Sequence, residues 1–175
     1  MSIYRSNPIT LNNPEVSIAK GRGKVKLLKR LVLLFLIVIL VLPYLLYWYG
    51  MSVWQSRPMP AHAILTQAEA ENVWSAVGGV GAPNLKAVGP WQFVLYFGCS
   101  IAQLEGSNRK CEQKYAGFLP VILIIEHYQQ QELINLPAWQ KAIVSSALVI
   151  WVTNNWTIDQ VLASLVEVKP EYLPK

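Results

Sequence analysis

Two glutamates have sequence surroundings that suit acid–base chemistry. Glu105 ends an apolar stretch and precedes Gly106, and Glu126 follows the apolar run 118–125 and precedes His127. Apolar surroundings disfavour a charged carboxylate, so the pKa rises and the group can exchange a proton near neutral pH. Enzymes that cleave or transfer sugars use carboxyl groups in this way. Glu105 is therefore the first candidate for a catalytic residue and Glu126 the second, although a glutamate at a helix end is more often simply solvated.

The sequence contains two cysteines, Cys99 and Cys111. In an oxidising compartment such a pair usually forms a disulfide, and the alternative is two buried thiols. A disulfide would tie an apolar segment to the polar loop 105–116. Closing a loop of this length would contribute about 3 kcal/mol by restricting the unfolded chain. We expect the disulfide, provided that this part of the chain lies outside the cytoplasm.

Other chemistries lack their motifs. His62 and His127 are far apart, and no CxxC, HxxxH or HExxH spacing accompanies them, so we expect no metal site. No GxSxG motif indicates a nucleophilic serine. Residues 21–24 lack the spacing and the Ser/Thr of a phosphate-binding loop. We therefore expect no cofactor.

A long apolar run dominates the first third of the chain. Residues 31–54 carry no charged side chain, and the next one is Arg57. About 20 such residues cross the roughly 30 Å hydrocarbon core of a bilayer as a helix, and such helices tolerate a proline like Pro43. Aromatic residues of the kind that collect at the lipid headgroups gather at its far end: Tyr44, Tyr47, Trp48, Tyr49 and Trp54. The sequence predicts a transmembrane helix over residues 31–54.

The distribution of charge predicts the direction of that helix. Residues 1–30 contain seven Lys/Arg and one Glu, whereas residues 31–175 contain eight Lys/Arg and nine Asp/Glu. The positive-inside rule places the basic side in the cytoplasm. We expect a mostly disordered cytoplasmic tail at 1–30, a linker at 55–63 and an outer domain at 64–175. In a bacterium the helix would lie in the inner membrane, with the domain in the periplasm and the lipid bilayer as its first partner.

Two other interpretations of this end of the chain are less favoured. Residues 61–63 read Ala-His-Ala, like a signal-peptide cleavage site, but the apolar run is much longer than the about 7–15 residues of a signal peptide. A nucleic-acid-binding protein usually carries its basic residues on a folded domain. Here they precede the apolar run, so we expect an uncleaved anchor and no nucleic-acid partner.

The outer domain has the pattern of a small helical fold. We expect helices over 67–77, 91–104, 138–153 and 158–167, and either one helix or a strand and a helix over 118–135. Thr66 to Glu69 and Thr157 to Gln160 form capping boxes. Asn154 and Asn155 suit a C-terminal cap. None of the later apolar runs reaches the about 18 residues of a second span.

The apolar residues also predict which side of each helix is buried. Segment 91–104 is apolar almost all round, which indicates deep burial or contact with lipid. In the helix over 138–153, one face would carry Ile143, Ala147, Ile150 and Trp151. The last helix would bury Ile158, Val161, Leu162 and Leu165. The fold class is therefore mainly α, with one N-terminal transmembrane helix and a small membrane-proximal all-α domain.

Residues 139–167 resemble part of the peptidoglycan glycosyltransferase domain of penicillin-binding proteins. The likeness rests on a long helix, the turn Asn155-Trp156-Thr157, and a short helix with Asp159 and Leu162. It implies a lysozyme-like helical domain that acts on cell-wall glycan or its lipid-linked precursor.

The sequence departs from this family in three motifs. The family has an acidic Glu-Asp-x-x-Phe-x-x-His motif. This sequence keeps only a counterpart of the glutamate, Glu105. The Ser-Thr-Ile-Thr-Gln-Gln motif corresponds to no more than residues 128–130, Tyr-Gln-Gln, and Tyr-Leu-Asn is replaced by Ser-Leu-Val at 164–166. The chain therefore looks like a degenerate relative of this family.

The sequence favours a non-catalytic function. The chain holds seven Trp and eight Tyr, which suit a protein–protein interface as well as a core. We expect a membrane-anchored envelope protein that acts as a binding or accessory module for a protein partner. The alternatives are an enzyme acting on peptidoglycan or its lipid-linked precursor, with Glu105 as catalytic residue, and a small subunit that works through its transmembrane helix.

Overall fold

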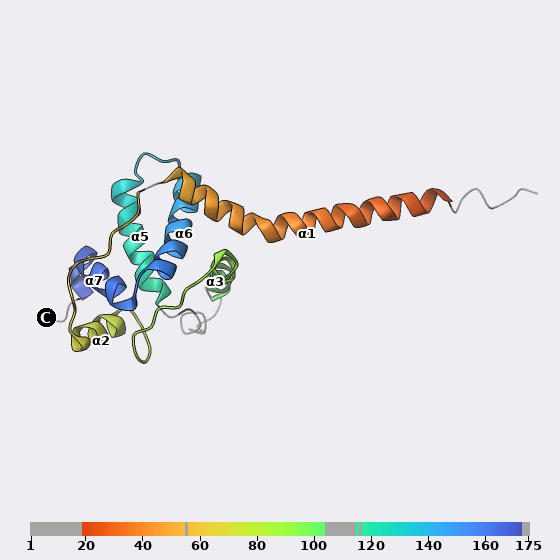
Figure 1. Ribbon diagram of the computed structural model, residues 1–175. Helices are drawn as coiled ribbons and strands as arrows, with labels where there is room; N and C mark the ends of the chain where they lie inside the picture. Colours follow the sequence, from red (N-terminus) through yellow and green to blue (C-terminus); the bar gives the residue numbers. More distant parts are fainter. Residues whose placement is uncertain (1–18, 55, 104–114, 116, 173–175) are drawn as a thin grey trace, which may run out of the picture. The chain divides into compact units, whose positions relative to one another are not determined.

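The computed structural model describes residues 19–54, 56–103, 115 and 117–172 (Figure 1). These residues form helices and no strand, so the predicted mainly α class is confirmed. The α-helices are α1 (Ala19–Val53), α2 (Gln67–Ala76), α3 (Pro90–Gln103), α5 (Phe118–Glu132), α6 (Ala138–Asn155) and α7 (Ile158–Val168). A 3₁₀ turn, η2, follows at Pro170–Tyr172.

The chain divides into two compact units, Met1–Val41 and Leu42–Lys175, and the boundary falls inside α1. Residues Lys26–Val53 of α1 form the one helix of the described chain that is long and apolar enough to cross a membrane. This bears out the expectation of one candidate membrane-spanning helix near the N-terminus. The helix starts at Ala19, so residues 19–30 of the predicted tail are helical rather than disordered.

The core of the second unit is formed by α5, α6 and α7, with α2 packed on α7 and α3 on α6 (Figure 1). On α7, Val161, Leu162 and Leu165 are fully buried, as predicted, and Ile158 is partly buried. In segment 118–135, for which a strand was one alternative, residues 118–132 form the single helix α5. A proline is tolerated in a first helical turn, so Pro120 does not prevent this helix.

Helix α6 is buried on two faces rather than one. Val144, Leu148 and Val152 are at most 1% exposed and belong to the core. The face predicted for this helix is only partly buried. Ala147 and Ile150 are buried, whereas Ile143 and Trp151 are half-buried. A helix in the middle of a small domain packs on neighbours in two directions, so one apolar stripe does not describe it.

Both predicted capping boxes are present. The Thr66 and Thr157 hydroxyls accept hydrogen bonds from the amides of Glu69 and Gln160, each at 3.3 Å. In return, Glu69 and Gln160 accept from the Thr66 and Thr157 amides at 2.8 and 2.9 Å. Two orphan donors at each helix start are thereby satisfied.

The predicted cap at Asn154 and Asn155 is wrong, because α6 continues through both residues and its C-cap is Trp156. The Asn154 side chain instead donates hydrogen bonds to the carbonyl oxygens of Ile150 and Val88, both at 2.7 Å. The contact with Val88 joins α6 to the segment that leads into α3.

An extended segment, residues 56–65, connects α1 to α2, and we call it the strap. At its start, Arg57 donates hydrogen bonds to the carbonyl oxygens of Trp54 and, at 3.2 Å, of Met51. A cation there satisfies carbonyls that the end of α1 leaves unpaired. Further along, the Ala61 amide donates to the Ser164 hydroxyl on α7 at 2.8 Å. The strap is thus held at its start and near its middle, and it includes most of the linker predicted at 55–63.

Candidate functional site

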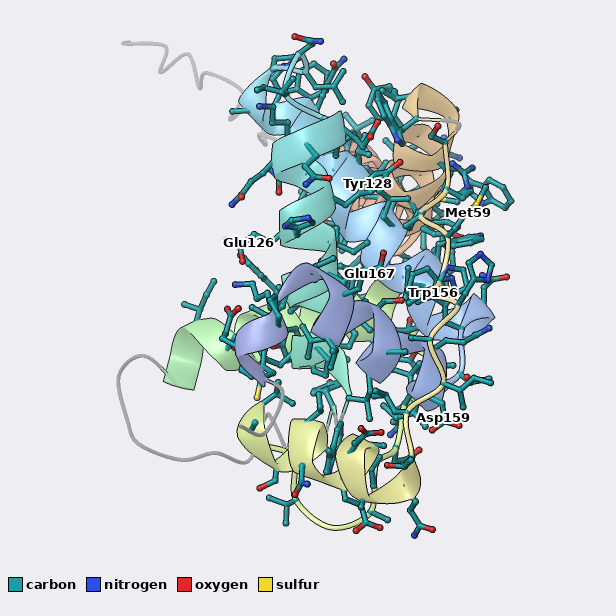
Figure 2. All side chains as sticks on the ribbon, turned by 90° about the vertical axis from the view of Figure 1, so that its left-hand side faces the viewer. Met59, Glu126, Tyr128, Trp156, Asp159 and Glu167 are labelled. Atoms are coloured by element: carbon teal, nitrogen blue, oxygen red, sulfur yellow. The ribbon has the colours of Figure 1, made fainter. Side chains whose placement is uncertain are left out.

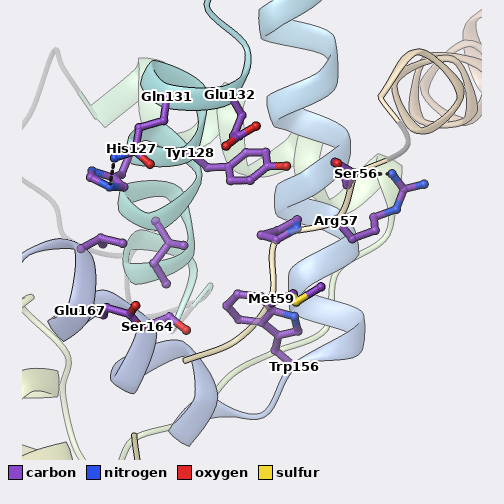
Figure 3. A pocket seen from close by; sticks show the side chains of 13 residues that line it. Ser56, Arg57, Met59, His127, Tyr128, Gln131, Glu132, Trp156, Ser164 and Glu167 are labelled. Carbon is purple, nitrogen blue, oxygen red and sulfur yellow. Dashed lines mark hydrogen bonds between the residues drawn. The ribbon is translucent and has the colours of Figure 1, made fainter. Parts of the chain in front are cut away.

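The strap, α5 and α7 enclose an open pocket of about 540 Å³, which we call the strap pocket (Figure 3). The strap forms one wall, and the other walls come from α5, α7 and the start of the α6–α7 turn. Its lining residues are Ser56, Arg57, Pro58, Met59, Ile124, His127, Tyr128, Gln131, Glu132, Trp156, Ser164, Glu167 and Val168.

One face of α5 supplies several of the polar groups of this pocket. Ile124, His127, Tyr128 and Gln131 follow one another at helical spacing and all line it. His127 and Gln131 are hydrogen-bonded through their Nε2 atoms at 2.9 Å. The Tyr128 hydroxyl accepts a hydrogen bond from Trp54 Nε1 at 3.1 Å, which fixes the ring next to the end of α1.

The charge of the strap pocket is mainly negative. Glu132 at the end of α5 and Glu167 near the end of α7 both line it. The Arg57 guanidinium also lines it, but this group is hydrogen-bonded to carbonyl oxygens at the end of α1. Carboxylates accept hydrogen bonds only, so the pocket suits a ligand that carries hydroxyl or cationic groups. Trp156 and Met59 add apolar surface for the rest of such a ligand.

A second pocket, of about 780 Å³, lies between the strap, α2 and the start of α7. It is lined by residues that include His62, Glu71 and Asp159. The two histidines therefore belong to different pockets. In the described part of the chain, no group of three or more His, Cys, Asp or Glu residues is arranged to hold a metal ion.

The structure describes only some of the residues that the sequence singled out. Glu105 and Cys111 lie outside the described residues. Cys99 lies on α3 and is not a free thiol. Glu126 is exposed and lines none of the pockets described here, and Figure 2 shows it on the side of α5 away from Met59. A carboxyl group used as a general acid is usually shielded from water, so the surroundings of Glu126 do not favour that role.

Sequence reasoning did not identify Glu132 and Glu167 as site residues. They are 35 positions apart in the sequence (167 minus 132), and their neighbours form no motif. A usable signal was the spacing of His127, Tyr128 and Gln131, which places three polar side chains on one helical face.

A third pocket, of about 200 Å³, is almost entirely apolar, and we call it the apolar pocket. Helices α1, α3 and α6 line it with Pro43, Leu46, Tyr47, Pro90, Phe93, Val94, Ala142, Ile143, Ser146, Ala147 and Ile150. The Ser146 hydroxyl donates a hydrogen bond to the Ala142 carbonyl oxygen at 2.7 Å. This pocket accounts for the face of α6 that carries Ile143, Ala147 and Ile150.

By its fold, the chain is a helical protein with one candidate membrane-spanning helix. Comparison with protein-family models, with curated proteins and with solved structures finds no match.

Proposed function

We propose that this protein is a binding or accessory module of the bacterial cell envelope, anchored in the inner membrane by α1 with its C-terminal domain in the periplasm. The observation that carries the proposal is the strap pocket, an open site with acceptors, donors and an aromatic ring next to the end of α1. The ligand is a polar segment of a protein partner. Glu132 and Glu167 select segments with basic or hydroxyl side chains.

The hydrogen bonding in the strap pocket supports binding rather than catalysis. The His127 imidazole pairs with the amide of Gln131. A histidine that acts as a general base is usually oriented by a carboxylate or another acceptor of comparable strength. An amide partner fixes the ring but does not stabilise the imidazolium as a carboxylate does.

Partner recovery from the membrane tests this proposal. Full-length protein with a C-terminal affinity tag is crosslinked in cells, solubilised in mild detergent and recovered. The double variant Glu132→Gln/Glu167→Gln should recover at least several-fold less partner than wild type. Glu126→Gln changes a carboxylate on the same helix outside the pocket, and it should recover the wild-type amount. Equal recovery by all three proteins, or no stable partner, would contradict the proposal.

The thiols provide a test of the compartment. We propose a Cys99–Cys111 disulfide, as expected for two cysteines of a periplasmic domain. In denatured protein from cells lysed with a thiol-blocking reagent, neither cysteine should react with a second alkylating reagent until a reductant is added. Mass spectrometry then counts two labelled cysteines. Labelling of both thiols without reduction would argue against this compartment and this bond.

A second candidate function, hydrolysis or transfer of cell-wall glycan, is favoured by one feature of the strap pocket. Glu132 and Glu167 line one cavity together with Trp156, and such enzymes use a pair of carboxyl groups. The resemblance over 139–167 and Glu105 also support it. Purified protein should then polymerise or cleave lipid-linked glycan, and either Glu105→Gln or Glu132→Gln should abolish this turnover. Absence of turnover in the wild-type protein would exclude this candidate.

A further inference from the structure

Helix α3 is attached to the domain by aromatic side chains on one face. The ring centroids of Phe93 and Tyr96 lie 5.9 and 4.4 Å from that of Phe118 on α5. Tyr96 also meets Tyr115 edge-on at 5.3 Å. These contacts fix which side of α3 faces the core, and the opposite side is largely exposed in the described domain.

That opposite side is as apolar as the side that packs. Val94, Leu95, Phe97 and Ile101 are 43%, 57%, 59% and 53% exposed. The segment Pro90–Gln103 contains no Asp, Glu, Lys or Arg. A helix that faces water normally carries charged or polar residues on its outer face. A contiguous exposed apolar face therefore indicates a contact with membrane or protein.

The apolar pocket indicates that this contact is with lipid. Pro43, Leu46 and Tyr47 line it together with Phe93 and Val94 of α3. These three α1 residues lie within the apolar window Lys26–Val53. About 20 residues counted from Leu31 cross the hydrocarbon core, so residues 43–47 fall inside the span. A part of α3 that shares a pocket with them is at the depth of the bilayer.

We propose that α3 is a second membrane-contacting element, whose outer face lies in the leaflet nearer the domain, and that the apolar pocket takes an acyl chain of a phospholipid. This inference rests on the membrane anchoring by α1 in the proposed function. At 14 residues, α3 is about 21 Å long, too short to cross the hydrocarbon core. It therefore lies in the interface as an apolar helix that does not span.

The Ser146 hydroxyl and Pro43 of the pocket are compatible with an acyl chain. The Ser146 hydroxyl is already hydrogen-bonded to the Ala142 carbonyl oxygen. Pro43 has no amide hydrogen to donate. A hydrocarbon chain in the pocket would therefore leave neither of these residues with an unpaired donor, which is the condition for burying them in an apolar environment.

Site-specific photocrosslinking tests the outer face. Benzoylphenylalanine replaces Phe97, Val94, Leu36 or Glu126, one at a time, in full-length protein in liposomes of phosphatidylethanolamine and phosphatidylglycerol with radiolabelled acyl chains. Leu36 lies in the apolar window of α1 and is the positive control, and exposed Glu126 is the negative control. Positions 97 and 94 should label lipid within several-fold of position 36, and position 126 should give background only.

The outcomes separate this inference from the proposed function. Background labelling at position 97 with strong labelling at position 36 would overturn the inference and leave the anchor intact. Adducts at position 97 with a second copy of the protein, or with another protein when the experiment is repeated in native membranes, would overturn it in favour of a protein contact. Background at position 36 would instead show that α1 does not contact lipid, and both proposals would fail.

A pocket-filling variant tests the acyl chain separately. Ala142 lines the apolar pocket and is itself exposed, so Ala142→Trp fills the cavity from its open side. This change should lower lipid labelling at position 94 several-fold and leave position 97 unchanged. Ser146→Leu serves the same purpose if Ala142→Trp elutes as an aggregate in detergent. Unchanged labelling at position 94 in a folded variant would contradict the proposal that the pocket takes an acyl chain.

Discussion

Gly50 lies where α1 packs tightly against α6. A Cβ atom at this position would lie 2.8 Å from Ala147 Cβ and 2.9 Å from the Ile143 carbonyl oxygen. Both atoms belong to the α6 backbone or are rigidly attached to it, so they cannot move without moving the helix. Small residues permit such close helix contacts in membrane proteins.

Replacing Gly50 with alanine should therefore force the two helices apart. Overpacking of this kind costs about 1–3 kcal/mol, so Gly50→Ala should lower the thermal unfolding midpoint in detergent. The control is Gly98→Ala on α3, where an added Cβ meets nothing within 4 Å. Alanine is about 1 kcal/mol better than glycine inside a helix, so this variant should match or exceed the wild type. Equal midpoints for the two variants would contradict the tight contact.

At the same scale, Glu69 should respond to pH. Hydrogen bonds from the Thr66 amide and then from the Thr66 hydroxyl lower the pKa of this carboxyl group from its ordinary value of 4.5. A lowered pKa in the folded state means that ionised Glu69 favours folding above pH 4.5, and that this contribution is lost as the pH falls through the lowered value. Chemical shifts of the Glu69 carboxyl carbon should report the low pKa.

Thr66→Ala separates the two hydrogen bonds of that capping box. It removes the hydroxyl and keeps the backbone amide, which has the larger effect. The pKa of Glu69 should therefore rise only part of the way to its ordinary value. A pKa of Glu69 that is the same in Thr66→Ala as in the wild type would show that the hydroxyl is not involved.

At the scale of the element, α7 depends on its N-terminal cap. Thr157→Ala removes the oxygen that accepts from the Gln160 amide, and such losses cost about 0.5–2 kcal/mol. Because α7 contributes fully buried residues to the core, the loss should appear in the cooperative unfolding of the whole domain. Thr157→Ser keeps a hydroxyl and should restore most of the stability. Equal destabilisation by both variants would point to lost packing of the threonine methyl group instead.

The helices could be predicted where their signals are local. Capping boxes involve side chains three residues apart, so Thr66 and Thr157 mark the starts of α2 and α7 correctly. The cap predicted at Asn154 is wrong because this residue lies inside α6, where its amide bonds Ile150 on the same helix and Val88, 66 residues away. The strap pocket depends on three segments that meet only in the fold, so no pattern in the sequence could show that Glu132 and Glu167 share it.

At the scale of the whole molecule, the net charge of +5 conceals two parts of different character. The first 30 residues carry +6, from seven basic and one acidic residue, and residues 31–175 carry −1, from eight and nine. The folded domain therefore has little net charge, and the basic residues gather next to the apolar window of α1. Such a distribution sets the direction of insertion and contributes little to the stability of the fold.

The orientation can be tested by changing these charges. An alkaline phosphatase fused after Lys175 is active only outside the cytoplasm, and it should be active on the wild-type protein. Lys24, Lys26, Lys29 and Arg30 lie at or just before the start of the candidate span Lys26–Val53. Replacing all four with glutamine should lower phosphatase activity per molecule, because basic residues near a span determine which end is retained in the cytoplasm.

The matched control removes charge where it should not affect insertion. Lys86, Lys141 and Lys169 lie more than about 20 residues beyond the apolar window, outside the range in which basic residues set topology. Their replacement by glutamine should leave phosphatase activity unchanged. The proposed orientation would be reversed if the wild-type phosphatase fusion were inactive and a fluorescent reporter fused to the C-terminus folded in the cytosol. The strap pocket and α3 would then face the cytoplasm, where a disulfide between Cys99 and Cys111 would not persist.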